Sequence, residues 1–245
     1  MERSPASRWI PPYESLKWAL PASLGHLHIL SYLLEHHSVT YTHKAMAAAA
    51  QSGRVSAVRF LHERGFSIDD VLHNACTSGQ LAVAQYAHAV GPRLLDPENT
   101  VIRTAHCGHL SLLQFLADSG YEVVSSTTLI YAATRGHLDV VKFLHERDTK
   151  GCPPPGRGSA AAYMCCTVSY LLEQIVTETF RPSVAVAQFL LDQHREHVDL
   201  VRVIRGCKKG RKTKTRTAEC DLILAYVLQL RGSFAPSRTT TCTLQ

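Results

Sequence analysis

One pattern recurs along most of this 245-residue chain at a nearly fixed interval. Its clearest copy, residues 136–146, reads Gly-His-Leu-Asp-Val-Val-Lys-Phe-Leu-His-Glu. Equivalent glycines are separated by 28, 26, 29 and 28 residues: Gly25, Gly53, Gly79, Gly108 and Gly136. Self-similarity at such a period is typical of stacked supersecondary units that bury their apolar faces against one another. The sequence therefore predicts a repeat array instead of one globular core.

The residues after each glycine have the pattern of an amphipathic helix. Apolar residues recur two, four, five, seven and eight positions after the glycine, and the seventh is always aromatic: Tyr32, Phe60, Tyr86, Phe115 and Phe143. This pattern covers a broad helical face, wide enough to contact a neighbour on each side. Because the aromatic column falls within the apolar face, we expect Phe60, Phe115 and Phe143 to be buried between repeats and not exposed for base stacking.

A shorter helix is predicted before each glycine. Small residues stand three and four positions before it, such as Ala49-Ala50 and Ala132-Ala133, which lets two helices approach closely. The glycine falls where this first helix ends, a place that favours a left-handed backbone. Polar residues stand at the expected N-caps: Thr42, Asp69, Asp70, Asn99, Ser125 and Ser126. The predicted fold class is all-α, a helical solenoid of stacked helix–turn–helix repeats.

This arrangement resembles the ankyrin repeat family. The family's small-residue pair, Gly-His turn and Val-Val-x-x-Leu second helix match Ala132 to Leu144, and the resemblance covers residues 14–147. The family's Thr-Pro-Leu-His opening is missing from every copy, with residues 127–130 the nearest approach, and the copies are shorter than the usual period of about 33 residues. The loops between repeats are therefore expected to be tight turns. Tetratricopeptide and armadillo arrays, at about 34 and about 40–47 residues per unit, fit the spacing less well.

The rest of the chain departs from the pattern. Residues 183–191 recover the second-helix pattern, with Phe189 in the aromatic column, as a degenerate sixth unit displaced by an insertion of about 18 residues. The predicted organisation is an N-terminal extension (1–13), about five ankyrin-like repeats (14–147), a Pro/Gly loop (148–159), one or more degenerate repeats (160–204), a basic loop (205–217), a C-terminal capping helix (218–231) and a flexible tail (232–245).

Basic residues concentrate in one segment near the end of the chain. Residues 202–216 hold eight Lys and Arg and no acid, so the net charge of +6 would become −2 without them. The candidate functional residues in this segment are Lys208, Lys209, Arg211, Lys212, Lys214 and Arg216. The sequence leaves three interpretations open: a solvated spacer, a nuclear import signal, or a nucleic-acid contact without interleaved aromatics.

The sequence contains no catalytic, cofactor or metal signature. Phosphate-loop, dinucleotide-binding, nucleophile-elbow and HExxH motifs are absent, and the eight cysteines form no C-x-x-C pair. Six of the fourteen histidines recur at two equivalent positions of the repeat, as structural residues do: His26, His109, His137, His62, His88 and His145. We expect no enzyme activity, no cofactor, no metal and reduced thiols.

The expected location is inside the cell. No apolar run approaches the roughly 20 residues that span a bilayer, and no unbroken apolar segment of the kind found in secretory signals follows Met1. We therefore expect no membrane contact and a cytoplasmic protein, which would also be nuclear if the basic segment is an import signal.

Function is predicted from the resemblance. Ankyrin repeats bind partner proteins through the first-helix surface and the turns, which implies a non-enzymatic, monomeric scaffold or adaptor whose partner is another protein. The residues expected to face that partner are Gln51, Thr77, Arg103, His106, Thr134 and Arg135. The alternative is a nucleic-acid-associated protein acting through residues 202–216. A third interpretation is that the chain is a repeat-bearing part of a larger protein.

Overall fold

The computed structural model of the chain describes residues 12–36, 42–91, 94–151, 183–194, 200–210 and 218–232, together with Leu172, Ile175 and Val198. All regular structure in these residues is helical, with no strand, and the all-α prediction is confirmed. The chain divides into two compact units, Met1–Val123 and Val124–Gln245.

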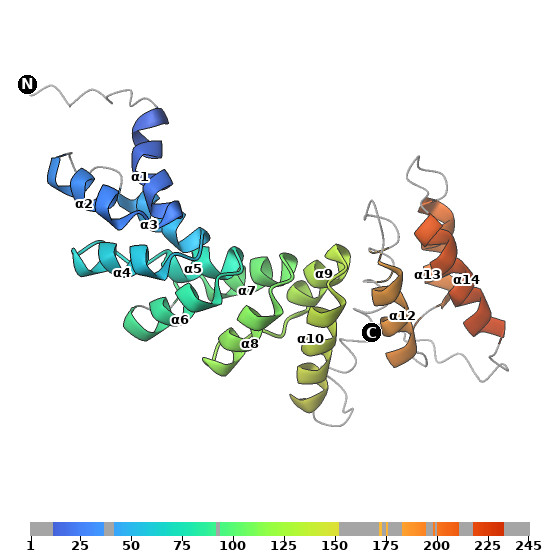
Figure 1. Cartoon of the computed structure of the whole chain (residues 1–245). Helices are drawn as coiled ribbons and strands as arrows, with labels where there is room; N and C mark the ends of the chain where they lie inside the picture. Colours follow the sequence, from blue (N-terminus) through green and yellow to red (C-terminus); the bar gives the residue numbers. More distant parts are fainter. Residues whose placement is uncertain are drawn as a thin grey trace, which may run out of the picture. The chain divides into compact units, whose positions relative to one another are not determined.

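The first unit holds eight helices among its described residues, in two layers (Figure 1). The first helices of the repeats pack side by side: α1 (Pro12–Leu24), α3 (Thr42–Gln51), α5 (Val71–Thr77) and α7 (Pro97–His106). The second helices form the other layer: α2 (Leu27–His36), α4 (Val55–Glu63), α6 (Leu81–Val90) and α8 (Leu110–Asp118). Each pair is one helix–turn–helix repeat, as the glycine spacing predicts.

The described part of the second unit begins with the fifth pair, α9 (Ser126–Arg135) and α10 (Leu138–Gly151). Next come α12 (Val184–Gln193), which packs against α10 and α14, and α13 (Leu200–Gly210), which packs against α14 (Ala218–Gly232). Residues 211–217 and 233–245 lie outside the described residues, as does most of the segment between α10 and α12.

Two helices extend into segments that were predicted from the sequence to be loops. Helix α10 continues to Gly151 because no helix breaker stands before it, and the prolines begin only at Pro153. Helix α13 continues to Gly210, because Leu200, Val203, Ile204 and Cys207 place apolar side chains on one helical face. Val203, Ile204 and Cys207 are buried. At the other end of the chain, α1 begins at Pro12, within the predicted extension.

The caps of the first helices were predicted only in part. Ser125 caps α9, and its Oγ accepts a hydrogen bond from the backbone N–H of Thr128 at 3.0 Å. The prediction for Asn99 was wrong: Asp96 caps α7, and its Oδ1 accepts from the Asn99 backbone N–H at 3.1 Å. The signal in the sequence was Pro97, because proline favours the first position of a helix and places the cap one residue earlier.

The aromatic column occupies the edge of the core. Phe60, Phe115 and Phe143 are half-buried, so the prediction that they are buried between repeats was wrong. At 3.6 residues per turn, positions four, five and eight after the glycine face the centre of the packed side, and positions two and seven lie at its two edges. The residues four, five and eight positions after the glycine form the core. Leu112, Leu113 and Leu116, for example, have no exposed surface.

The repeat glycines hold the backbone conformation that was predicted. Gly25, Gly53, Gly79, Gly108 and Gly136 have φ between 73° and 82°. At four of these glycines, a side chain from the next repeat or repeat-like unit lies close to the place where a Cβ would stand. The pairs are Arg54 on Gly25, Gln80 on Gly53, His109 on Gly79 and, in the second unit, Ser183 on Gly136. The turns are thus stacked, and the absence of a Cβ leaves room for the neighbour.

Replacing Gly79 with alanine should destabilise the protein more than replacing Gly120, although both residues have positive φ. Each change introduces left-handed strain of about 1–2 kcal/mol. A Cβ on Gly79 would also lie 2.8 Å from Cε1 of His109, whereas nothing lies within 4 Å of a Cβ on Gly120. Urea unfolding of Gly79→Ala, Gly120→Ala and Gly79→Ala/His109→Ala measures the difference. Equal losses for the two single variants would show that the stacked turn contributes nothing to stability.

Candidate functional site

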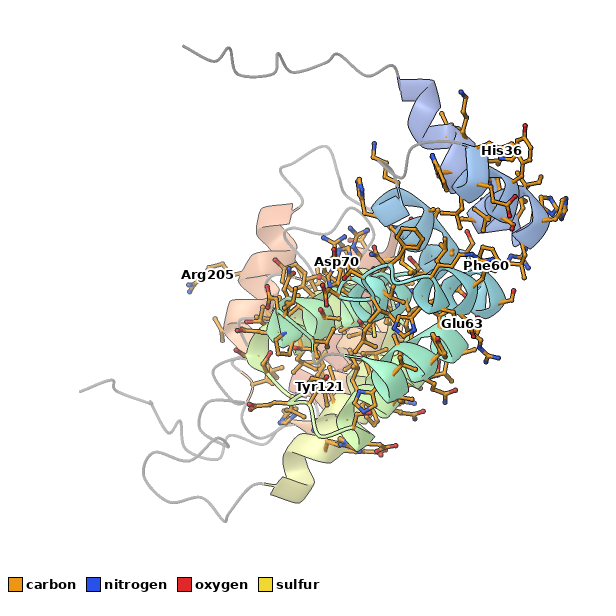
Figure 2. The ribbon with its side chains drawn as sticks, turned by 90° about the vertical axis from the view of Figure 1, so that its left-hand side faces the viewer. His36, Phe60, Glu63, Asp70, Tyr121 and Arg205 are labelled. Atoms are coloured by element: carbon orange, nitrogen blue, oxygen red, sulfur yellow. The ribbon has the colours of Figure 1, made fainter. Side chains whose placement is uncertain are left out.

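Each first helix exposes one stripe of residues to solvent. Positions nine and five residues before the glycine are exposed or half-buried in every repeat of the first unit, whereas positions three, four and seven are buried. Asp70, at the start of α5, lies apart from Phe60 and Glu63 of the second-helix layer (Figure 2). The exposed stripes of α1, α3, α5 and α7 lie side by side, because these helices pack in that order.

The six predicted surface residues differ in solvent exposure. Arg103 in the first unit and Arg135 in the second are exposed. Gln51 is exposed, and its Nε2 donates to Oδ1 of Asn74 on the next first helix at 3.1 Å. Thr77 and Thr134 are half-buried, and each hydroxyl donates to a carbonyl of its own helix. His106 is half-buried.

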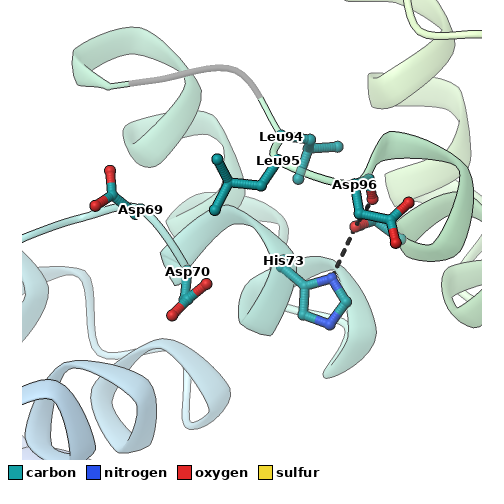
Figure 3. A pocket seen from close by; sticks show the side chains of 7 residues that line it. Asp69, Asp70, His73, Leu94, Leu95 and Asp96 are labelled. Atoms are coloured by element: carbon teal, nitrogen blue, oxygen red, sulfur yellow. Dashed lines mark hydrogen bonds between the residues drawn. The ribbon is translucent and has the colours of Figure 1, made fainter.

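An acidic pocket of about 200 Å³ opens at the loop ends of α5 and α7 (Figure 3). The residues that line this acidic pocket are Asp69, Asp70, His73, Leu94, Leu95, Asp96 and Thr100. The Thr100 hydroxyl donates to the Asp96 carbonyl oxygen at 2.8 Å and lies 2.7 Å from His73 Nδ1. Because a hydroxyl has only one proton, the Nδ1–H of His73 donates to Thr100. The pocket therefore combines a fixed polar floor with three carboxylates.

Neither the acidic pocket nor the exposed apolar surface of α1 was predicted from the sequence. The two loops that contribute Asp69, Asp70 and Asp96 are far apart in the chain, and only the packing of α5 beside α7 brings them together. Leu16, Leu20 and Leu24 are spaced four residues apart, which was a readable signal for one helical face. The exposure of this face could not be predicted, because apolar residues occur all round α1.

The second helices carry a ladder of histidine–aromatic contacts. A histidine nine residues after a repeat glycine contacts the aromatic residue of the next unit in edge-to-face geometry. The pairs are His62 with Tyr86 and His88 with Phe115, at ring-centroid distances of 6.4 and 5.5 Å, and His145 with Phe189 in the second unit, at 5.5 Å. These recurring histidines therefore have a packing role.

Most of the six basic candidate residues near the end of the chain lie outside the residues that the structure describes. Lys208 and Lys209 belong to α13, but their side chains are not described, and Arg211, Lys212, Lys214 and Arg216 lie outside the described residues. Arg205 is described and exposed. The import-signal and nucleic-acid interpretations of this segment stay predictions.

No disulfide is formed by the cysteines of the described residues: Cys76, Cys107, Cys207 and Cys220. Within the same residues, no three His, Cys, Asp or Glu side chains are placed to hold a metal ion. Of the helices described, none combines the length and apolar character that crossing a membrane requires.

Cys76 should resist alkylation in the folded protein, whereas Cys107 should react. Burial of Cys76 disfavours its thiolate and raises its pKa to about 12. At pH 8 only roughly one Cys76 in ten thousand is then the reactive thiolate. Cys107 is exposed in the turn after α7. Iodoacetamide labelling followed by peptide mass spectrometry measures both rates. Comparable labelling of the two residues without urea would contradict the burial of Cys76.

Comparison with known proteins agrees with this architecture. Two family models match the chain, ankyrin repeats (3 copies) at residues 72–154 and ankyrin repeats (many copies) at residues 43–88. The chain is also similar to the crystal structure of the human ASB11 ankyrin repeat domain, with 17% sequence identity and a TM-score of 0.58, over 96% of this chain and 100% of that one. At this identity the likeness shows the fold alone. No curated protein matches the chain.

Residues 43–154 therefore match ankyrin repeats, and the resemblance drawn from the sequence is confirmed. Ankyrin repeats are generally protein–protein interaction modules, built as stacks that offer a long continuous surface.

Proposed function

We propose that the chain is a non-enzymatic adaptor or scaffold, which binds another protein through the exposed stripe of its first helices. Stacked first helices present neighbouring stripes on one face, so a partner can contact several repeats at once. The candidate contacts in the first unit are Gln51, Thr77, Arg103 and His106, and those in the second unit are Thr134 and Arg135.

The observation that carries this proposal is the contrast between packed and exposed positions of the same helices. The packed positions three residues before the glycine hold small residues in every repeat of the first unit. The position five residues before it is exposed or half-buried and changes from one repeat to the next: Leu20, Ala48, Asn74 and Arg103. A surface that varies in this way has no packing role to fill, and it can discriminate one protein partner from another.

No observation favours the nucleic-acid alternative. The acidic pocket places Asp69, Asp70 and Asp96 at the loop ends of the first unit, where they would repel phosphates. The rings of Tyr86 and Phe115 are half-buried against His62 and His88, so these two are not free platforms for bases.

The experiment is affinity capture from cells with the full chain carrying Arg103→Glu or Arg135→Glu. Each variant has a matched control in its own unit, Arg59→Glu on α4 for the first and Lys142→Glu on α10 for the second. All four residues are exposed, so each change reverses one surface charge. We expect at least one first-helix variant to lose proteins that the wild type captures, and both second-helix controls to retain them.

Circular dichroism and melting temperature verify that the four variants are folded. Retention of every partner by both first-helix variants would contradict the proposal. Loss of the same partners from a control would instead place the binding on the second helices.

A further inference from the structure

Three leucines form an exposed apolar stripe on α1, here called the leucine face: Leu16, Leu20 and Leu24. Their side chains are 59%, 55% and 49% exposed. A spacing of four residues aligns them on one side of the helix. The opposite side of α1 packs into the unit through Trp18 and Ala22, which are buried. The leucines therefore contribute little to the core.

The other repeats of the first unit have no equivalent of the leucine face. At nine, five and one residues before their glycines they place polar or small residues: Lys44, Ala48 and Ser52, then Asp70, Asn74 and Ser78, then Asn99, Arg103 and Cys107. The fold thus accepts polar residues at all three positions. Three leucines at exposed positions of one repeat point to a contact outside the unit.

The leucine face is different from the open end of the array. Ile29 on α2 is exposed, but its equivalents in the following repeats, Ala57, Val83 and Leu112, are fully buried. Ile29 is thus exposed because, among the described helices, only α1 and α4 pack closely on α2. The equivalents of the three leucines are exposed or half-buried even inside the stack. A preceding repeat would therefore not cover the leucine face, which leaves this face open to a separate occupant.

The surface beside the leucine face is mixed on α3 and then acidic. On α3 the half-buried Ala47 and Ala48 lie between the exposed Lys44 and Ser52, and the small alanine side chains let a bound segment approach the helix. Next comes the acidic pocket, where no basic side chain of the described residues pairs with Asp69, Asp70 or Asp96. The Asp70 carboxylate has no hydrogen-bond partner among those residues either. Exposed Leu95 borders these charges and offers apolar contact.

We propose that this surface binds an amphipathic segment of a partner protein, with apolar side chains on the leucine face and a Lys or Arg side chain in the acidic pocket. The inference rests on the proposed function and names the chemistry of the partner. Charge complementarity selects a cationic segment, because three carboxylates without a basic partner among the described residues attract an ammonium or guanidinium group. The same carboxylates repel nucleic acid and anionic lipid.

The distance between the leucine face and the acidic pocket sets how far apart the apolar cluster and the basic residue lie in the partner segment. Neighbouring helices lie about 10 Å apart, so two steps from α1 to α5 cover about 20 Å. That distance corresponds to about six residues of extended chain or about 13 residues of helix. The partner segment should therefore carry its apolar cluster and its basic residue at one of these separations.

The test is a selection of phage-displayed random peptides of about 16 residues, long enough for either conformation, on the purified full chain. Selected peptides are then measured against Leu16→Ser/Leu20→Ser and against Asp70→Lys. Val90→Ser on α6 is the apolar control, because Val90 is 47% exposed on a second helix. Gln114→Lys on α8 is the charge control, because Gln114 is exposed.

We expect the wild type to select peptides with an apolar cluster and a Lys or Arg at the stated separation. Their affinity should fall about 10-fold or more in the leucine variant, the loss expected when buried leucine contacts are removed. A similar fall is expected for Asp70→Lys, and selection on that variant should enrich Asp and Glu. Both control variants should bind the peptides as the wild type does.

Failure to select such peptides, or equal binding by the variants and the wild type, would overturn the proposal. So would self-association of the full chain that Leu16→Ser/Leu20→Ser abolishes in sedimentation, because a second copy would then occupy the leucine face. Binding that appears only after deletion of residues 1–11 would assign the face to the chain's own first residues. Partners captured from cells through Arg103 or Arg135 would leave the proposed function standing in each of these cases.

Discussion

Replacing Trp18 with alanine should lower the free energy of unfolding by about 3–5 kcal/mol. Trp18 is 2% exposed in α1, on the side that packs into the unit, and its removal leaves a cavity that the helix cannot fill by a small shift. A loss of this size is comparable to much of the stability of a typical domain. Urea unfolding followed by circular dichroism measures it from the midpoint and slope.

The matched control for Trp18 is Leu20→Ala, two residues later in the same helix. Leu20 belongs to the leucine face and is exposed, so its truncation should change stability by no more than about 0.5 kcal/mol. If Leu20→Ala were as costly as Trp18→Ala, the leucine face would be part of the core, and the peptide-binding proposal would lose its basis. If Trp18→Ala cost less than about 1 kcal/mol, the packing of α1 on α3 would be wrong.

Replacing Leu116 with alanine should cost about 2–5 kcal/mol, and more than replacing the neighbouring Phe115. Leu116 has no exposed surface, because its position eight residues after the glycine faces the centre of the stack. Phe115 is larger but half-buried at the edge, where its ring meets His88 at 5.5 Å. Side-chain size alone would give the opposite order, so the comparison separates burial from volume.

Thermal and urea unfolding of Leu116→Ala, Phe115→Ala and the double variant would establish the order. A larger loss of stability for Phe115→Ala than for Leu116→Ala would show that the aromatic column belongs to the core. The two residues are adjacent on one helix, so a strong coupling between their effects would indicate a shared cavity.

The repeat register was predictable because each unit meets the same neighbour on each side. The same packing therefore selects similar residues at every copy, and the small pair Ala132-Ala133 and the turn glycine Gly136 could be assigned before any coordinates. The degree of burial at the edges was not predictable. It depends on how far each second helix is covered by the next, which the sequence pattern at Phe115 does not encode.

The candidate surface was less predictable than the fold. Sequence position placed Thr77 and Thr134 next to the turn, but each hydroxyl is occupied by a carbonyl of its own helix. This local hydrogen bond competes with any external partner, and a pattern of residue types cannot reveal it. The acidic pocket depends on two loops meeting through tertiary packing, so Asp70 and Asp96 could not be paired from their separation along the chain.

The stacked turns have a consequence for how such a chain can grow. In the first unit, the residue that covers a glycine follows it by 27 to 30 positions, from Gln80 on Gly53 to His109 on Gly79. Ser183 covers Gly136 from 47 positions away. The contact depends on the local geometry of two turns and does not depend on the length of the connection. New sequence can therefore enter between α10 and α12 during evolution without erasing the register of the neighbours, which makes this junction a place where the array can acquire additional parts.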